Sequence, residues 1–392
     1  MTAPRIPESG ASREFVGGGE SAGTAPVERG RPIASVVEPG GGFEGELLAT
    51  RDETPARPGR PWAAIASAVL LAVLYLAAAF APWVAPYPPS QQNREMPNAP
   101  PMRLHLNPPS RWASDGLLYA HPQRLVDSLR RRYEVDSTAR IPLAFGARGH
   151  LLAPVDPAAR VFLLGSDALG RDLFSRLVHG GRVSLSVGLI GVAISSLVGM
   201  TVGTIAGYVG GRTDAILMRL CEVMMALPAF YFLLALAAII PPGLSPAQTF
   251  LLIVALMSFI RWAGFARVVR GIVAGVRERE HVQAARALGA SLPRILFRHV
   301  APAAAGYAIV ASTLAIPGFI LGESALSLLG LGIQEPSTSW GSLLSDAQNL
   351  TNLDRYPWIL APGVLIAVTT MAFNFLGDHL RDRLDPRSAG GA

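Results

Sequence analysis

The segment REREHVQAARALGASLPRILFRHVAP, residues 277–302, interrupts a chain that is otherwise strongly apolar. Long apolar runs flank it on both sides, and its five arginines are mixed with enough alanine and leucine to pack as a helix. The whole chain has 392 residues, of which 50% are hydrophobic and only 16% charged, and its mean hydropathy is +0.35. These values predict a membrane protein. Residues 277–302 are then a charged loop between two spans.

The first half of this loop has the spacing of a helix. Val282, Ala285 and Leu288 fall on one helical face. The opposite face carries Gln283, Arg286 and Ala287. Gly289 is expected to end this helix, because glycine favours the turn conformations that terminate helices.

A second short helix is expected after the glycine. Ser291 is a suitable N-cap, and Pro293 suits the first helical turn. In the first helix the small side chains of Ala284 and Ala285 would let another surface dock closely. The residues alone leave two interpretations open, a docking element for a partner and a basic helix lying on anionic lipid.

Apolar runs of about 20 residues, the length that spans a bilayer, occur six times. They lie at about 62–84, 183–207, 217–240, 248–269, 306–330 and 358–377. The predicted fold class is an all-α integral membrane protein with six transmembrane helices. Residues 1–60 are rich in Gly, Pro, Ser and Glu, and predict a disordered tail before an anchor helix at 61–84.

Glycines recur at every fourth position near the end of the second predicted span. They are Gly199, Gly203, Gly207 and Gly211. Such a stripe of small residues allows close helix packing in a membrane. We therefore expect a tight helix contact at Gly199, Gly203 and Gly207.

The distribution of arginine predicts the orientation in the membrane. The loop after the fourth span carries seven of them: Arg267, Arg270, Arg277, Arg279, Arg286, Arg294 and Arg298. The segment 241–247 carries none, and 331–357 has only Arg355. The charged loop is therefore expected in the cytoplasm, together with both termini.

Residues 85–163 form an expected insertion on the outer face, between the first span and a core of five further spans at 164–387. The insertion mixes Pro-rich pieces with short amphipathic ones such as QRLVDSLRRRY. Its run of three arginines, Arg130 to Arg132, is expected to be a solvated surface, and no nucleic-acid partner is predicted.

The charged loop resembles a known motif. QAARALG from Gln283, followed after nine residues by HVAP ending at Pro302, is similar to the cytoplasmic EAA loop of ATP-binding-cassette (ABC) importer permeases. In that family a short coupling helix fits a groove on the ATPase subunit. The resemblance implies this role for Ala284, Ala285, Gly289 and Pro302. Gln283 stands where the family has glutamate, so an ion pair at this position does not follow.

Four other segments resemble the C-type permease subunit of dipeptide, oligopeptide and nickel importers. They are LGSDALGRDLFSRLVHGGRVSLSVG from Leu164, AGYVGGRTDAILMRLCEVMMALP from Ala206, GESALSLLGLGIQEPSTSWG from Gly322 and FNFLGDHLRDRLDPR from Phe373. Together they cover about 164–387 in the family's order. The resemblance implies the type I importer fold and a multi-pass subunit of the bacterial inner membrane. It also implies peptides as the default substrate.

The same resemblance implies the partners. They are a second permease subunit that shares the pathway, two ATPase subunits and an extracytoplasmic solute-binding protein, all assembled around the bilayer. The sequence has no lysine, and a phosphate-binding loop requires one. ATP and Mg²⁺ are therefore expected on the ATPase subunits, with no cofactor on this chain.

Several charged residues are expected near or within the spans. Glu323, Asp167, Arg171 and Asp172 are candidates for the pathway or the receptor side. Helical spacing would also allow structural pairs, Asp167 with Arg171 and Asp172 with Arg176. Arg261 falls inside the fourth span, where a charge costs about 2.5–3.5 kcal/mol on insertion scales.

Other classes of protein find less support. No catalytic motif and no metal-ligand spacing occurs, so neither an enzyme nor a metal site is predicted. The alternative is a secondary transporter driven by an ion gradient, which would show inverted repeats and midplane acidic residues. The sequence shows no such repeat.

Overall fold

The structure is a computed structural model that describes residues 61–112, 116–241 and 243–384. The predicted tail at 1–60 and the end of the predicted core after residue 384 lie outside these ranges.

Five helices of the described chain are long and apolar enough to cross a membrane. The helices concerned are α2 (Pro61–Ala79), α5 (Leu173–Val209), α8 (Pro246–Val276), α11 (Ala305–Leu328) and α14 (Ala361–Leu384). Each corresponds to a predicted span, although α5 begins ten residues before the expected 183. Asp172 explains the earlier start, because its side chain caps the first turn by accepting a hydrogen bond from the amide of Ser175.

The third predicted span, 217–240, is not one helix. α6 (Gly211–Ala226) and α7 (Ala229–Ala238) meet at an angle of 81°. Pro228 lies at the break, where its ring disfavours helical geometry in Leu227 and it offers no amide hydrogen. Counting this bent pair as one span gives six within the described residues. The predicted span is therefore broken at the proline, which apolar length alone does not indicate.

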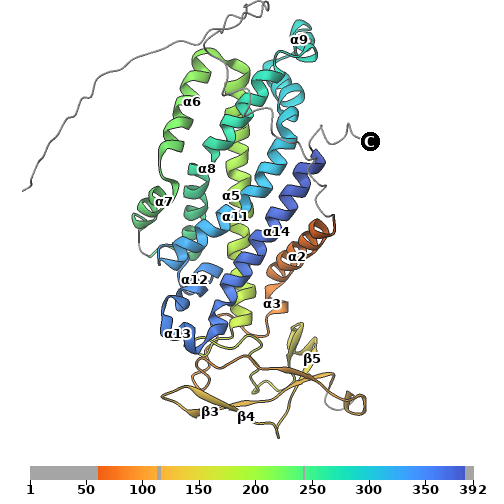
Figure 1. The fold of residues 1–392 in the computed structure, drawn as a ribbon, viewed down its shortest axis with the longest axis vertical. Helices are drawn as coiled ribbons and strands as arrows, with labels where there is room; N and C mark the ends of the chain where they lie inside the picture. Colours follow the sequence, from red (N-terminus) through yellow and green to blue (C-terminus); the bar gives the residue numbers. More distant parts are fainter. Residues whose placement is uncertain (1–60, 113–115, 242, 385–392) are drawn as a thin grey trace, which may run out of the picture. The chain divides into compact units, whose positions relative to one another are not determined.

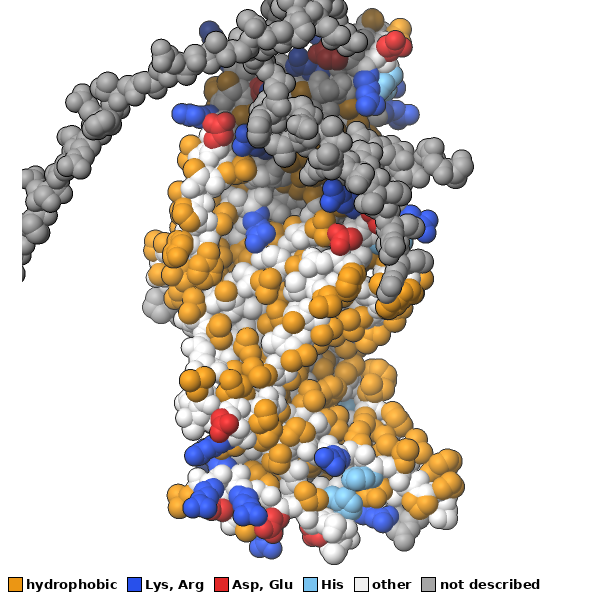
Figure 2. Space-filling view, viewed as in Figure 1, with side chains coloured by type: hydrophobic (Ala, Val, Ile, Leu, Met, Phe, Trp, Pro, Cys, Tyr) orange, Lys and Arg blue, Asp and Glu red, His pale blue; other side chains and the backbone are white. Residues whose placement is uncertain are grey.

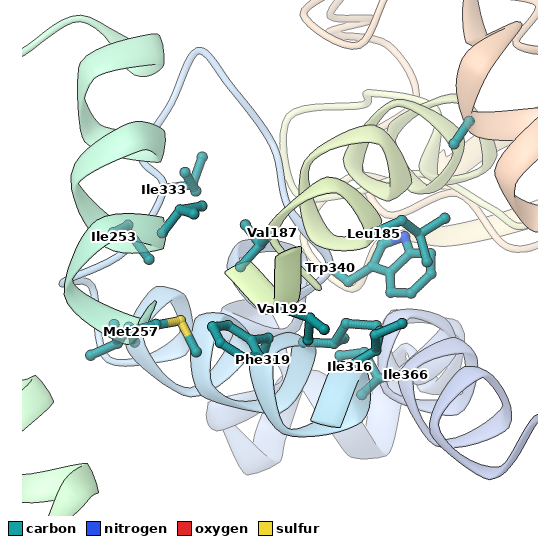
Figure 3. Packing of buried hydrophobic residues seen from close by; sticks show 14 of the residues in the cluster. Leu185, Val187, Val192, Ile253, Met257, Ile316, Phe319, Ile333, Trp340 and Ile366 are labelled. Atoms are coloured by element: carbon teal, nitrogen blue, oxygen red, sulfur yellow. The ribbon is translucent and has the colours of Figure 1, made fainter. Parts of the chain in front are cut away.

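The long helices pack as a bundle around α5 (Figure 1). α5 contacts α8, α11 and α2, and α14 lies against α11 and α2. Figure 3 shows the core where α5, α8 and α11 meet, with Met257 beside Phe319 and Val192 beside Ile316. Trp340 closes this core from α12 (Trp340–Leu344) and is 1% exposed.

Three glycines of the predicted stripe lie where α5 crosses α8. A Cβ atom added to Gly199, Gly203 or Gly207 would come within 2.9 Å of a backbone carbonyl oxygen of α8. Gly211 does not belong to this contact: it begins α6, and an added Cβ would meet nothing within 4 Å. The contact therefore depends on three glycines, since any side chain there would push the helices apart.

The insertion contains β-strands, which the all-α expectation did not include. β1 (Leu104–Leu106), β2 (Leu118–Ala120), β5 (Ile141–Phe145) and β6 (Leu152–Pro154) form an antiparallel sheet in the order β1-β2-β5-β6. The amphipathic piece QRLVDSLRRRY forms a hairpin of β3 (Gln123–Asp127) and β4 (Arg132–Val135). Along β3 every second residue is less exposed, as in a strand that packs with one face.

The insertion has a small core of its own. Met102, Ala120, Leu143 and Phe162 are among its buried apolar residues. The amide of Met102 donates to the carbonyl of Phe162 at 2.8 Å, which joins the start and the end of the strand region. We call the end of the bundle near these strands the insertion end, and the opposite end, where α8 finishes, the coupling end.

Short helices complete both ends. At the insertion end lie α3 (Ala81–Val84), η1 (Pro109–Arg111), η2 (Ala147–Gly149), η5 (Ser345–Gln348), α13 (Leu350–Arg355) and η6 (Pro357–Leu360). At the coupling end lie α9 (Glu280–Ala287), α10 (Leu292–Ile295), a π-helical turn η3 (Leu296–Val300) and η4 (Ala301–Ala304). In Figure 2 apolar side chains cover much of the middle of the bundle, and most charged side chains gather at its two ends.

Candidate functional site

The charged loop folds as predicted into a helix, a glycine bend and a second helix. α9 buries Val282 and Ala285, which are 2% and 9% exposed. Val282 joins an apolar cluster with Val273 and Val276 of α8 and Ile295 of α10. This packing attaches the small helix firmly to a long span.

Leu288 departs from its predicted place on the buried face. Its side chain is 88% exposed. α9 ends at Ala287, and Gly289 then adopts φ +75°. The chain therefore turns before Leu288 can reach the face of Val282. An added Cβ on Gly289 would meet nothing within 4 Å, so the glycine is required for its backbone conformation and not for space.

The other residues of the motif lie on the surface of the described chain. Gln283, Ala284 and Pro302 are all exposed. The Gln283 side chain donates to the carbonyl of Arg277 at 3.2 Å. An amide can make this bond and a carboxylate cannot, so glutamine has a local role at the position where the resemblance expects glutamate.

Two polar contacts tie the coupling end together. Arg270 of α8 pairs with Asp214 in the first turn of α6. Arg277 donates to the carbonyl of Tyr208 at 3.4 Å, near the end of α5. These contacts join the ends of α5, α6 and α8 beside α9.

A large groove opens between α5 and α11 toward the coupling end. It encloses about 910 Å³ and is lined mainly by apolar residues of both helices, with the hydroxyl groups of Ser196, Thr201, Ser312 and Thr313 among them. α10 and η3 reach its edge through Leu292 and Phe297. The groove therefore connects the loop after α9 to the middle of the bundle.

Arg261 lies at the sixteenth of the 31 residues of α8. It is exposed on the single chain, where its guanidinium donates to the carbonyl of Gly318 at 3.1 Å and lies over the ring of Phe319. In the described part of the chain it has no carboxylate partner within ion-pair distance.

The predicted charged residues at the insertion end form one compact network. Asp167 pairs with Arg171 at 2.6 Å and also with Arg176, although both Asp167 and Arg171 precede α5 and the helix that the spacing predicted there does not form. Glu335 joins from the segment after α11, at 2.9 Å from Arg171 and 2.5 Å from Arg176. Arg176 and Asp167 are each 4% exposed in their side chains. The network therefore ties the start of α5 to a distant segment of the chain.

Sequence spacing missed Glu335, because the contact spans 159 residues between Arg176 and Glu335. The predicted pair of Asp172 with Arg176 does not form. Asp172 caps α5 instead, where Ser175 gives it bonds of 2.8 Å from the amide and 2.6 Å from the hydroxyl. Burial raises the pKa of Asp172 to about 6, and its second oxygen, Oδ1, has no hydrogen-bond partner.

Glu323 is 0% exposed inside the bundle. It accepts hydrogen bonds from Ser184 of α5 at 3.0 Å and from Ser327 of α11 at 2.6 Å. The oxygen of Ser184 also accepts from the amide of Trp340 at 3.1 Å. This carboxyl group therefore joins α5, α11 and α12 within the chain and does not face the groove.

Comparison with known proteins identifies the family. The family described as "Binding-protein-dependent transport system inner membrane component" matches residues 199–390, and "N-terminal TM domain of oligopeptide transport permease C" matches residues 60–101. The chain is 42% identical over 224 residues to the oligopeptide transport system permease protein OppC of Haemophilus influenzae, covering 57% of this chain and 70% of that protein.

Two further relatives extend the match. OppC of Bacillus subtilis is 39% identical over 61% of this chain and 76% of its own length. The di/tripeptide transport system permease protein DppC of Pseudomonas aeruginosa is 34% identical over 84% of this chain and 89% of its own length. The chain belongs to the family of inner membrane components of binding-protein-dependent transport systems.

The permease is thus a multi-pass, pore-forming subunit of the ABC importer type. These findings give no support to a secondary transporter. The two family descriptions leave residues 102–198 unmatched, a range that includes every strand of the insertion.

Proposed function

We propose that this permease is one of two membrane subunits of an ATP-driven peptide importer. The relatives OppC and DppC carry peptide transport in their names and match this chain over most of their lengths. A solute-binding protein would deliver the peptide at the insertion end. ATPase subunits would bind at the coupling end.

ATP hydrolysis belongs to separate ATPase subunits in this proposal. The sequence contains no lysine, so it cannot form the lysine-containing loop that binds the phosphates of ATP in such enzymes. ATP and Mg²⁺ would bind there, and this chain would hold no cofactor.

The exposed leucine at the end of α9 is the observation that carries the proposed contact with the ATPase. Leu288 is 88% exposed, in a loop that also exposes Phe297 at 75% and Leu292 at 49%. Such large apolar side chains are favourable on a surface when a partner covers them. Ala284 and Gln283 beside them are small or polar enough to let a groove on the partner close over α9.

The second permease would cover the groove between α5 and α11 and the face that carries Arg261. A guanidinium in the middle of a span is expensive to expose to lipid. Its position at the centre of α8 therefore supports a partner or a hydrated pathway on that side, and not lipid.

Transport would follow from rocking of the spans between two openings. Val282 packs α9 into one apolar cluster with the end of α8, and the contacts of Arg270 and Arg277 join α8 to α6 and α5, so these elements would move together. ATP binding to the partners and the loaded receptor would each stabilise one opening through contacts that the other opening lacks.

The proposed contact with the ATPase subunits also sets the orientation of the permease in the membrane. ATPase subunits of importers work in the cytoplasm, so the coupling end would face inward and the insertion end outward. α2 begins and α14 ends on the coupling side of the bundle (Figure 1). Both termini would then be cytoplasmic.

The test is a Leu288→Glu variant in the complete importer, reconstituted in liposomes with its ATPase and receptor. We expect the ATPase subunits to be lost on purification, together with peptide uptake and receptor-stimulated ATP hydrolysis. Leu129→Glu is the matched control, because Leu129 is 93% exposed on the insertion hairpin, and it should retain the ATPase subunits. Normal retention of the ATPase by Leu288→Glu would reject the proposed contact.

A further inference from the structure

A pocket lined by arginines lies at the insertion end, where the hairpin β3–β4 meets the segment that leads into α14. It encloses about 550 Å³. Its charged lining consists of Arg130, Arg131, Arg132 and Arg355. The proposed coupling and transport roles use none of these residues, and the strands lie in the part of the chain that the family descriptions leave unmatched.

The pocket has a strong excess of positive charge. None of its lining residues is acidic. Within the described ranges, none of its four arginines forms an ion pair. Asp127 is the acidic residue at the start of the turn. Its Oδ1 accepts hydrogen bonds from the amides of Leu129 and Arg130, at 2.9 Å each, and so shapes the turn. Like charges gathered in this way repel one another unless an anion joins them.

The hairpin turn is shaped so that the arginines are held together. Arg131 has φ +50°, in the left-handed region that usually favours glycine or asparagine. A non-glycine residue in that region costs on the order of 1 kcal/mol. Arginine at this position is therefore unfavourable for the turn itself, which points to a role for its side chain.

The wall opposite the hairpin is aromatic and fixed. Tyr356 is 9% exposed, and its ring lies 5.5 Å from that of Trp358. Trp358 donates to the carbonyl of Ser166 at 3.1 Å. On the hairpin itself, Tyr133 of β4 donates to the carbonyl of Pro97 at 2.7 Å. The flexible arginines thus face a preformed surface.

The pocket lies beside the start of a segment that is long and apolar enough to cross a membrane, Pro357–Leu384. Trp358 belongs to η6, directly before α14 begins at Ala361. Tryptophan and tyrosine are enriched where membrane spans meet the headgroup region. Figure 2 shows arginine side chains gathered at the same end of the molecule, over the region of β3 and β4.

We infer that this arginine pocket binds the phosphate group of an anionic phospholipid headgroup from the leaflet at the insertion end. Guanidinium groups suit phosphate because their forked donors match its oxygens in pairs. A zwitterionic choline headgroup fits less well, since its ammonium would meet the same arginines. The inference depends on where the pocket lies in the fold, and it would hold for either direction of transport.

The test measures lipid binding to the purified full-length chain in detergent by native mass spectrometry, with phosphatidylglycerol and phosphatidylcholine as probes. The variant Arg130→Gln/Arg131→Gln/Arg132→Gln should bind phosphatidylglycerol roughly tenfold more weakly, from three exposed charge contacts. Binding of phosphatidylcholine should hardly change.

The matched control is Arg94→Gln/Arg103→Gln/Arg124→Gln. It removes the same charge from exposed positions of the same insertion that do not line the pocket, and should weaken phosphatidylglycerol binding less than twofold. Arg355→Gln provides a second route that leaves the hairpin sequence intact, and we expect it to weaken binding severalfold. Thermal melting of each variant checks its folding.

Three results would overturn the inference. One is equal weakening by the pocket and control variants, which indicates general attraction. The second is that inorganic phosphate saturates the pocket and phosphatidylglycerol is not retained, which indicates a soluble ligand. The third is loss of receptor binding in the pocket variants with lipid binding unchanged, which indicates a protein partner.

Discussion

At the scale of single residues, Asp172 makes the stability of the permease depend on pH. Its folded pKa is raised to about 6 by burial, above the ordinary value of 3.8. Between these two values the folded chain binds a proton that the unfolded chain has released, so stability falls as the pH rises through this window. Above about pH 7 the carboxylate is charged in both states and this contribution no longer changes.

We expect the melting temperature of the detergent-solubilised chain to fall between pH 5 and pH 7. The loss from this group is about 1 kcal/mol, or roughly 2–4 °C. Asp172→Asn should remove this component while keeping the helix cap, since asparagine caps helices as well as aspartate does. Differential scanning fluorimetry of both proteins provides the measurement. An unchanged pH slope in Asp172→Asn would show that another group is responsible.

At the scale of elements, the glycine contact between α5 and α8 sets the distance between two spans. A Cβ on Gly203 would lie 2.5 Å from the carbonyl oxygen of Ala266 and 2.8 Å from the Cβ of Val269. Gly203→Ala should therefore lower the free energy of unfolding by about 1–3 kcal/mol, the usual cost of overpacking.

Gly271 of α8 is the matched control for this substitution. An added Cβ there meets nothing within 4 Å. Alanine also has the higher helix propensity, so Gly271→Ala should be neutral or slightly stabilising. Thermal melting of the two variants separates them, and equal effects would mean that the α5–α8 contact is looser than the structure indicates.

Local patterns in the sequence predicted most elements, whereas distant contacts could not be predicted. Apolar length located five long helices, and the glycine bend at Gly289 followed from its neighbours. The break at Pro228 was a local signal that apolar length concealed. Glu335 and the burial of Glu323 depend on segments that meet only in the folded chain, and no spacing along the sequence encodes them.

At the scale of the whole molecule, Arg261 tests whether its side of α8 faces lipid or water in the assembled importer. We expect Arg261→Cys in the reconstituted complex to react with a water-soluble thiol reagent, because a pathway supplies the water that ionises a thiol. Native Cys221 is 0% exposed and should add little background.

Phe259→Cys is the control for this experiment. Phe259 is 52% exposed two residues earlier on α8, on the opposite side of the helix. It should stay unmodified if lipid covers it. Modification of Phe259→Cys with no modification of Arg261→Cys would place the pathway on the other face of α8.

The hydrogen bond between Met102 and Phe162 also has a practical consequence. The chain enters and leaves the strand region close to this pair, whose amide nitrogen and carbonyl oxygen lie 2.8 Å apart. A segment whose two ends lie close together in this way can be replaced by another folded domain. A compact foreign domain grafted between residues 103 and 161 would therefore give electron microscopy a rigid marker for aligning images of a molecule that is otherwise mostly hidden in its micelle.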